Sequence, residues 1–285
     1  MSTNEQKALW ATGAAGWVAN EAIYDSVYAP VTAAVLGAAD LRPQTTILDV
    51  GCGTGTLVQA ASHAGSSATG IDISPAMVEA AKNRVPQAEI VLGDAQDENL
   101  NALPGAPFQR VISRFGVMFF PDPVAAFSNL RLATSTGGRL VFACWRGLSE
   151  NTIFTAGLER LTERVAQPAA PVSPGAPGPV AFADPDLLRG ILDDSGWQQI
   201  SIEALDFVCD FGALNGTDGV EERLAVVLGG PRARHARAEL EPVLGPAGWN
   251  DLVEQIRQDL RAARDPGTGT LRVPAAVWLV QAVNR

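Results

Sequence analysis

Three glycines at alternate positions form the strongest chemical signal in the chain. Residues 47–57 read ILDVGCGTGTL, so Gly51, Gly53 and Gly55 directly follow an apolar stretch that favours a short buried strand. Residues 56–61 can then begin a helix. A strand, a glycine-rich turn and a helix bring backbone N–H groups close to a bound nucleotide, because glycine has no Cβ to block the approach.

The spacing of these glycines discriminates between ligands. Dinucleotide enzymes carry G-x-G-x-x-G, but here Thr56 stands where the third glycine belongs and Gly55 comes one residue early. The resulting D-x-G-x-G-x-G, which begins at Asp49, resembles the first motif of the class I S-adenosylmethionine (SAM) dependent methyltransferases. In that family the turn packs against the methionine and ribose part of SAM. The resemblance therefore implies cofactor contacts from Asp49, Gly51, Cys52 and Gly53.

Two acidic residues follow at the ends of the next predicted strands, 68–73 and 89–92. Asp72 comes about 20 residues after the first glycine, the spacing at which a carboxylate reaches ribose hydroxyls in nucleotide-binding α/β folds. Asp94 matches the family residue that, with its neighbour, meets the adenine. Either carboxylate taken alone could instead stabilise a turn. The resemblance adds Asp72, Ile73, Asp94 and Ala95 to the cofactor set.

Residues 108–113 form the predicted fourth strand, and the segment after this strand should lie at the carboxyl end of the sheet, where open α/β folds bind ligands. The resemblance places Ser113 and Arg114 at the cofactor. Arg114 would bind the SAM carboxylate or an acidic substrate group, although a structural ion pair is an equal alternative. The candidates for the wall of the substrate pocket are Phe115, Met118 and Phe119. Core packing is the commoner fate of such side chains.

The arrangement of predicted elements indicates an α/β fold. Five strands alternate with four helices between residues 46 and 146, which implies a doubly wound parallel sheet. Two later strands, 197–207 and 271–283, match the edge hairpin of class I methyltransferases. The resemblance implies a seven-stranded, mostly parallel, Rossmann-like sheet with an antiparallel last strand. The expected parts are an N-terminal helical lid (1–40), the SAM-binding core (41–146), a cap insertion (147–182), a core helix and strand (183–207), a helical cap insertion (208–268) and the last core strand (269–285).

Several connecting segments receive their own predictions. Residues 134–138 read as a turn, and residues 149–165 read as one helix. The proline-rich residues 168–179 read as a loop. In the second half, the predicted helices cover residues 184–194, 217–228, 233–244 and 249–263.

Composition limits the partners. The formal net charge of -10 disfavours a nucleic-acid substrate, because an acidic surface repels phosphates. Cys52, Cys144 and Cys209 show no paired spacing, so we expect neither disulfides nor a zinc site, and no other metal. Residues 1–7 lack a signal core, and no apolar run approaches the roughly 18 residues that cross a bilayer. We expect a cytoplasmic protein without membrane insertion that acts on a small-molecule acceptor, with a homodimer as one option.

The family chemistry needs few catalytic groups. Methyl transfer is an in-line displacement at an activated methyl, so the protein mainly holds the acceptor close, aligned and dry. Some such enzymes add a general base when the acceptor is a hydroxyl. The weak candidates for this role are His235, Tyr24 and Tyr28, and none is assigned. The acceptor atom, oxygen, nitrogen or carbon, stays open.

Within the family, the chain most resembles small-molecule methyltransferases of the ubiquinone and menaquinone type. A nicotinamide-dependent oxidoreductase would share the strand, the turn and Asp72. Two features count against this class: the third glycine of its motif is missing, and the chain has no convincing catalytic Tyr-x-x-x-Lys set. A SAM-binding partner protein without catalysis is a further alternative. Binding of SAM against NADH separates the first two classes, and turnover separates the first from the third.

Overall fold

The computed structural model describes residues 13–166 and 175–285. Within these residues seven strands form one sheet: β1 (Thr46–Val50), β2 (Ser67–Asp72), β3 (Glu89–Leu92), β4 (Phe108–Arg114), β5 (Thr134–Trp145), β6 (Gln198–Asp210) and β7 (Arg272–Val283). Their spatial order is β3-β2-β1-β4-β5-β7-β6. β7 is antiparallel to both neighbours, and the other neighbouring strands are parallel. The predicted doubly wound sheet with an antiparallel last strand is confirmed.

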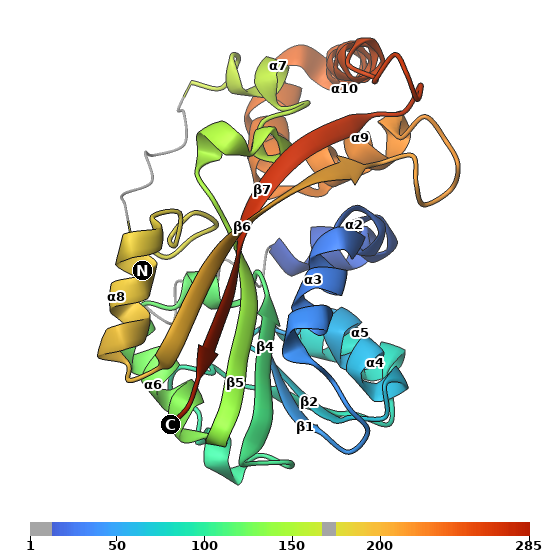
Figure 1. Ribbon diagram of the computed structural model, residues 1–285. Coiled ribbons are helices and arrows are strands. Elements are labelled where there is room, and N and C mark those ends of the chain that lie inside the picture. Colours follow the sequence, from blue (N-terminus) through green and yellow to red (C-terminus); the bar gives the residue numbers. More distant parts are fainter. Residues whose placement is uncertain (1–12, 167–174) are drawn as a thin grey trace.

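Helices cover both faces of this sheet (Figure 1). One face carries α3 (Ala29–Ala39), α4 (Thr56–His63) and α5 (Pro75–Arg84), and α2 (Glu21–Val27) precedes them. The other face carries α6 (Pro123–Leu132) and α8 (Pro185–Asp194). Proline in the first turn begins several of these helices, because its fixed φ suits a position whose N–H has no partner in the helix.

The central strands bring the glycine turn and the acidic residues to one edge. β1 is almost entirely buried, and it pairs with β2 on one side and with β4 on the other. Because parallel neighbours end at the same edge of a sheet, the segments after Val50, Asp72 and Arg114 meet there. Gly51 and Gly116 touch at this edge, since a Cβ on Gly51 would lie 2.7 Å from the Gly116 Cα.

A second group of helices stands beyond the end of β5, and we call it the cap. It consists of α7 (Glu159–Thr162), α9 (Val220–Gly229) and α10 (Pro231–Ala262), which enclose an apolar cluster of their own. β5 pairs with β7 only as far as Val277, whereas β6 and β7 stay paired to Arg272. The long hairpin of β6 and β7 therefore carries the sheet into the cap (Figure 1).

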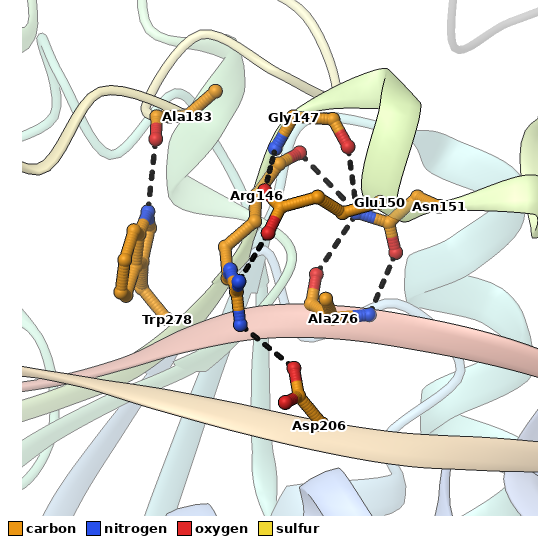
Figure 2. A network of polar contacts seen from close by, with 8 residues as sticks. All are labelled: Arg146, Gly147, Glu150, Asn151, Ala183, Asp206, Ala276 and Trp278. Atoms are coloured by element: carbon orange, nitrogen blue, oxygen red, sulfur yellow. Dashed lines mark hydrogen bonds and ion pairs between the residues drawn. The ribbon is translucent and has the colours of Figure 1, made fainter.

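A polar network ties the chain that follows β5 to this hairpin (Figure 2). Asn151 is fully buried, and its Nδ2 donates to the carbonyls of Arg146, Gly147 and Ala276 while its Oδ1 accepts from the Ala276 N–H at 2.8 Å. Arg146 pairs with Glu150 and with Asp206 of β6, and its guanidinium lies 5.0 Å from the centre of the Trp278 ring. The chain leaving β5 is thus bonded to both strands of the hairpin.

Two local predictions need correction. Residues 149–165 do not form one helix but short turns, η3 (Leu148–Glu150), η4 (Thr152–Phe154) and α7, because Gly157 adopts φ +84° and breaks the helical path. Residues 134–138 are not a separate turn but the start of β5, with a register shift opposite β4. The two helices predicted on either side of residue 245 are confirmed: they share the label α10, but non-helical angles at Gly245 (φ +70°) separate them.

Some predictions fall outside the described residues. These are the first part of the predicted lid, residues 1–12, and most of the proline-rich loop, residues 167–174. Among the described residues, no single helix is both long and apolar enough to cross a bilayer. α2 and α3 pass that test only when taken together, across a bend of 67°.

Candidate cofactor and acceptor site

A cavity of about 470 Å³ lies at the carboxyl edge of β1, β2 and β4, between the N-terminal helices and the cap. Most of the side chains predicted from the sequence line it. From the cofactor set these are Asp49, Gly51, Cys52, Gly53, Asp72, Ile73, Asp94, Ala95 and Arg114. From the other sets they are Phe115, Met118, Phe119, Tyr24 and Tyr28. The structure therefore brings together residues that lie up to 95 positions apart.

The glycine turn combines close packing with open space. Gly51 (φ +65°) packs directly against Gly116, where no Cβ fits on either residue. Gly53 (φ +54°) differs, because a Cβ there would have no atom within 4 Å and would point into free volume. Gly55 (φ +87°) is the N-cap of α4. The turn thus leaves room beside Gly53 at the wall of the cavity.

Asp72 is held in place by backbone donors. Its Oδ2 accepts from the Gly53 N–H at 2.8 Å, and its Oδ1 accepts from the Ser74 N–H at 2.9 Å. Burial raises the pKa of this carboxyl, and the backbone hydrogen bonds oppose the rise. Each carboxylate oxygen can accept more than one hydrogen bond, so Asp72 is oriented and still able to accept from a ligand.

Asp49 is a buried carboxylate without a well-formed hydrogen bond. It is 1% exposed, and neither carboxylate oxygen has a partner of hydrogen-bond geometry among the described residues. Burial raises its pKa to about 7 and Asp72 adds to the rise, whereas nearby Arg114 and the backbone N–H of Val58, in the first turn of α4, oppose it. Leaving such a group unpaired costs free energy, so a carboxylate at a cavity wall indicates a ligand that donates to it.

Asp94 shows the same feature at the end of β3. Its Oδ1 accepts from the Gln96 N–H at 3.0 Å, whereas its Oδ2 is buried without a hydrogen-bond partner among the described residues. The Asn129 side chain donates to the carbonyl of Ala95 at 2.9 Å and so fixes this loop. Asp94 also lines the cavity, so the segment after β3 contributes a second buried carboxylate to its wall.

Arg114 takes part in the structural ion pair that was one of its two predicted roles. Its Nη1 donates to Thr32 Oγ1 at 2.6 Å, and its Nη2 lies 3.5 Å from Asp25. Asp25 also pairs with Arg84 at 2.7 Å and accepts from Thr56 at 2.6 Å. Arg114 nevertheless lines the cavity, so the ion pair does not remove it from reach of a ligand.

Two predicted residues lie elsewhere. The Ser113 hydroxyl is fully buried, donates to the Val50 carbonyl at 2.7 Å and accepts from the Gly116 N–H at 3.1 Å. Ser113 thus links β1 to the segment after β4 and stabilises the glycine turn. It does not line the cavity, which corrects its predicted cofactor contact. His235 lies on α10 with its side chain 62% exposed, beside Glu239 and away from the cavity, so its predicted role as a base is not supported.

The tyrosines are poorly suited to act as bases. Burial raises the pKa of Tyr24 and, more strongly, that of Tyr28. Both phenols are therefore protonated near neutral pH and can only donate or accept hydrogen bonds. Their rings belong to an aromatic wall in which Trp17 stacks on Tyr24 at 4.0 Å between ring centres. Tyr28 meets Phe115 edge-on at 5.2 Å and so joins the wall to the core.

Arg223 lines the cavity from the cap and was missed by the sequence analysis. It is 3% exposed on α9, next to Leu224 and at helical spacing from Val220 and Val227, which are also buried. An arginine within the apolar stripe of a helix is unusual, because such residues are rarely buried without a partner. That position in the stripe was the signal that could have identified it.

Comparison with known proteins bears on this geometry. A family model described as a methyltransferase domain matches residues 48–142. An uncharacterised protein of Mycobacterium tuberculosis is 33% identical over 141 residues, and the match covers 49% of either chain, so this chain spans about half the length of that relative. The demethylmenaquinone methyltransferase of Renibacterium salmoninarum is 30% identical over 182 residues, which cover 60% of this chain and 74% of the relative.

Solved structures share the architecture. Phosphoethanolamine N-methyltransferase 2 of Haemonchus contortus, solved in complex with SAM, aligns with a TM-score of 0.50 at 18% identity. The alignment covers 92% of this chain and 56% of that one, and it shows a common fold. Together with the sequence relatives and the family model, these matches show that the chain belongs to the class I SAM-dependent methyltransferase family.

Proposed function

We propose that this protein transfers a methyl group from SAM to a small-molecule acceptor. The observation that carries the proposal is the pair of buried carboxylates with orphaned oxygens, Asp49 and Asp94, on the wall of a cavity bounded by the glycine turn. SAM presents hydrogen-bond donors to its surroundings: an ammonium group, two ribose hydroxyls and an adenine amine. The donors of SAM thus match the acceptors that the cavity leaves without partners.

Each group of SAM has a suitable residue. Asp49 would accept from the ammonium group, Asp72 from the ribose hydroxyls and Asp94 from the adenine amine. Arg114 would neutralise the carboxylate, which is the acidic group of SAM. The open space at Gly53 would admit the ligand next to the backbone.

The chemistry requires little beyond positioning. When bound, SAM supplies a methyl group on a positively charged sulfur, which is already a good leaving group. The acceptor's lone pair would form the new bond to the methyl carbon while the carbon–sulfur bond breaks and its electrons stay on sulfur. The aromatic wall would keep water out and hold the acceptor in line. Because the tyrosines stay protonated, a proton released by the acceptor would pass to solvent.

The relatives support a small-molecule acceptor. The demethylmenaquinone and phosphoethanolamine enzymes are each named for a small molecule. The net charge of -10 also makes a nucleic-acid substrate unfavourable.

Calorimetry with SAM, S-adenosylhomocysteine and NADH tests the cofactor. We expect binding of the first two and none of NADH, and binding of NADH alone would contradict the proposal.

Asp72→Ala should weaken SAM binding by about 1–3 kcal/mol through loss of charge-assisted hydrogen bonds, and unchanged affinity would contradict the assigned site. Formation of S-adenosylhomocysteine on a panel of metabolites tests turnover, and its absence on every acceptor would favour a SAM-binding protein without catalysis.

A further inference from the structure

Arg223 is a buried cation that the proposed methyl transfer leaves without a role. Its Nη2 donates to the carbonyls of Ile153 at 2.7 Å and of Ala156 at 2.6 Å, and its Nε donates to Ala156 at 3.1 Å. The guanidinium carbon lies 5.4 Å from the centre of the Phe211 ring. Nη1 has no hydrogen-bond partner among the described residues. One nitrogen of the fork is therefore available to a ligand.

The charge of Arg223 has no direct ion-pair partner. Within the part of the chain that the structure describes, no carboxylate oxygen lies within 4.0 Å of its guanidinium, and Glu159, which couples to it electrostatically, lies farther away. Burial lowers its pKa, but an arginine stays protonated in proteins. Carbonyl dipoles satisfy its hydrogen bonds without cancelling its charge. A buried charge without a directly paired counterion is costly, so the site favours an anion that arrives from the cavity.

The charged residues on the cavity wall are divided between its two ends. The carboxylates of Asp49, Asp72 and Asp94 lie at the ends of the core strands, on the side assigned to the cofactor. Arg114 lies there too, in its ion pair with the N-terminal helices. Arg223 alone among the charged lining residues comes from the cap. An anionic group on the acceptor would therefore meet repulsion at the cofactor end and attraction at the cap end.

The walls near Arg223 are aromatic. Tyr28 and Tyr24 lie close enough to couple electrostatically to Arg223. Beyond them, Phe115 and Trp145 stack face to face at 4.4 Å between ring centres, and Phe154 meets Trp145 edge-on at 5.1 Å. All of these residues line the cavity. Flat rings on several sides favour a planar aromatic guest, which can pack against them by stacking or edge contacts.

We infer that the acceptor is a planar aromatic molecule with a single oxyanion, and that Arg223 binds this oxyanion through Nη1. One free nitrogen suits a carboxylate or phenolate oxygen better than a phosphate, since a phosphate would need several donors to balance its charge. This acceptor class rests on the methyl transfer proposed above. Arg223 would then determine specificity from the cap, while the core strands hold the cofactor.

Equilibrium binding of two matched probes tests the inference. The probes are 4-hydroxybenzoate and 4-hydroxybenzamide, which share ring and shape but differ in charge, added to protein saturated with S-adenosylhomocysteine. We expect the acid to bind at least about tenfold more tightly than the amide, the ratio that one charge-assisted hydrogen bond provides. Arg223→Gln should bring this ratio close to one, and Arg223→Lys should keep a preference for the acid.

Arg232→Gln is the matched control, because Arg232 donates to the Phe154 carbonyl of the same loop but is exposed and does not line the cavity. It should leave the ratio unchanged. Equal binding of both probes by the wild type, binding of neither, or a preference that survives Arg223→Gln would overturn the inference. If Arg223→Gln does not fold, equal binding of both probes by the wild type still overturns the inference, and loss of the preference for the acid in folded Arg223→Lys does so as well.

Binding of S-adenosylhomocysteine is measured separately in every variant. If it binds and the acid is not preferred, the acceptor class is wrong while the proposed methyl transfer stands. If it does not bind to the wild type, both proposals fail together.

Discussion

At the residue scale, the site consists of acceptors fixed in place before any ligand arrives. Asp72 is oriented by two backbone N–H groups, whereas Asp49 and Asp94 keep buried oxygens without partners. Ordering these carboxylates during folding leaves little to reorganise on binding, which strengthens each interaction with a donor. Such groups destabilise the free protein, because the free-energy cost of their desolvation is offset only when a ligand donates a hydrogen bond to them.

The protonation of Asp49 leads to a pH-dependent prediction. Its pKa of about 7 means that the carboxyl is mostly neutral below this pH and mostly charged above it. Only the charged form attracts the SAM ammonium, so affinity for SAM should rise by up to about tenfold between roughly pH 6 and pH 8. Asp49→Asn should bind SAM more weakly and without this dependence.

Calorimetry at several pH values measures both effects. Asp251→Asn, an exposed carboxylate on α10, is the control and should reproduce the wild-type profile. A wild-type affinity that stays flat or falls across this range would show that Asp49 does not meet the ammonium.

At the element scale, the N-terminal helices are attached to the core next to the glycine turn. Asp25 of α2 accepts from Thr56, the first residue of α4, and pairs with Arg84, the last residue of α5. Thr32 of α3 accepts from Arg114 at the end of β4. The segment that contributes Tyr24 and Tyr28 to the cavity is thus held by polar contacts at its rim.

Asp25→Ala should loosen this attachment. The variant leaves Thr56 and Arg84 without their shared acceptor, and we expect a loss of about 1–3 kcal/mol in the free energy of unfolding. Denaturant titration measures it. Glu21→Ala is the matched control, because among the described residues Glu21 pairs with Arg84 alone, at 3.1 Å, and its side chain is more exposed than that of Asp25, so its loss should stay below about 1 kcal/mol. Equal effects of the two variants would contradict a special role for Asp25.

The contact between the turn and the segment after β4 gives a second prediction at this scale. A Cβ on Gly116 would lie 2.4 Å from the Val50 carbonyl oxygen and 2.8 Å from the Gly51 Cα, both of them backbone atoms. Gly116→Ala should therefore destabilise the fold by about 1–3 kcal/mol and weaken SAM binding as the turn moves. Gly37→Ala is the control, since its Cβ would meet no atom within 4 Å. Wild-type stability in Gly116→Ala would refute the packing argument.

At the scale of the whole molecule, the cavity depends on the placement of the cap over the core. The cap has its own apolar cluster, and the hairpin of β6 and β7 is continuous with the sheet. A further tie is the network around Asn151 and Arg146, which bonds the chain leaving β5 to that hairpin (Figure 2). The position of Arg223 relative to the cofactor end follows from these connections.

Asn151→Leu tests this tie. Leucine has a similar volume but no amide, so the buried Ala276 N–H would lose its acceptor, whereas the Ala276 carbonyl would still accept from the Arg146 N–H; we expect a cost of about 1–3 kcal/mol in the free energy of unfolding. We also expect weaker acceptor binding with SAM binding nearly unchanged, because the cofactor end belongs to the core. Glu150→Gln, which alters an exposed member of the same network, should have a smaller effect. Loss of SAM binding in Asn151→Leu would show that the cap and the cofactor end are not separable in this way.

Local patterns in the chain determined the core and the cofactor end. Alternating apolar strands and helices specify a parallel sheet, and parallel strands deliver the residues that follow them to one edge, so Asp49, Asp72 and Asp94 could be placed without coordinates. Only the tertiary structure decided the opposite end. The burial of Arg223 at the cavity depends on which distant segments pack against it. The same holds for Ser113, whose hydroxyl bonds to the backbone and not to a ligand. Sequence periodicity reports the apolar face of an element, but it does not report the partner against which that face packs.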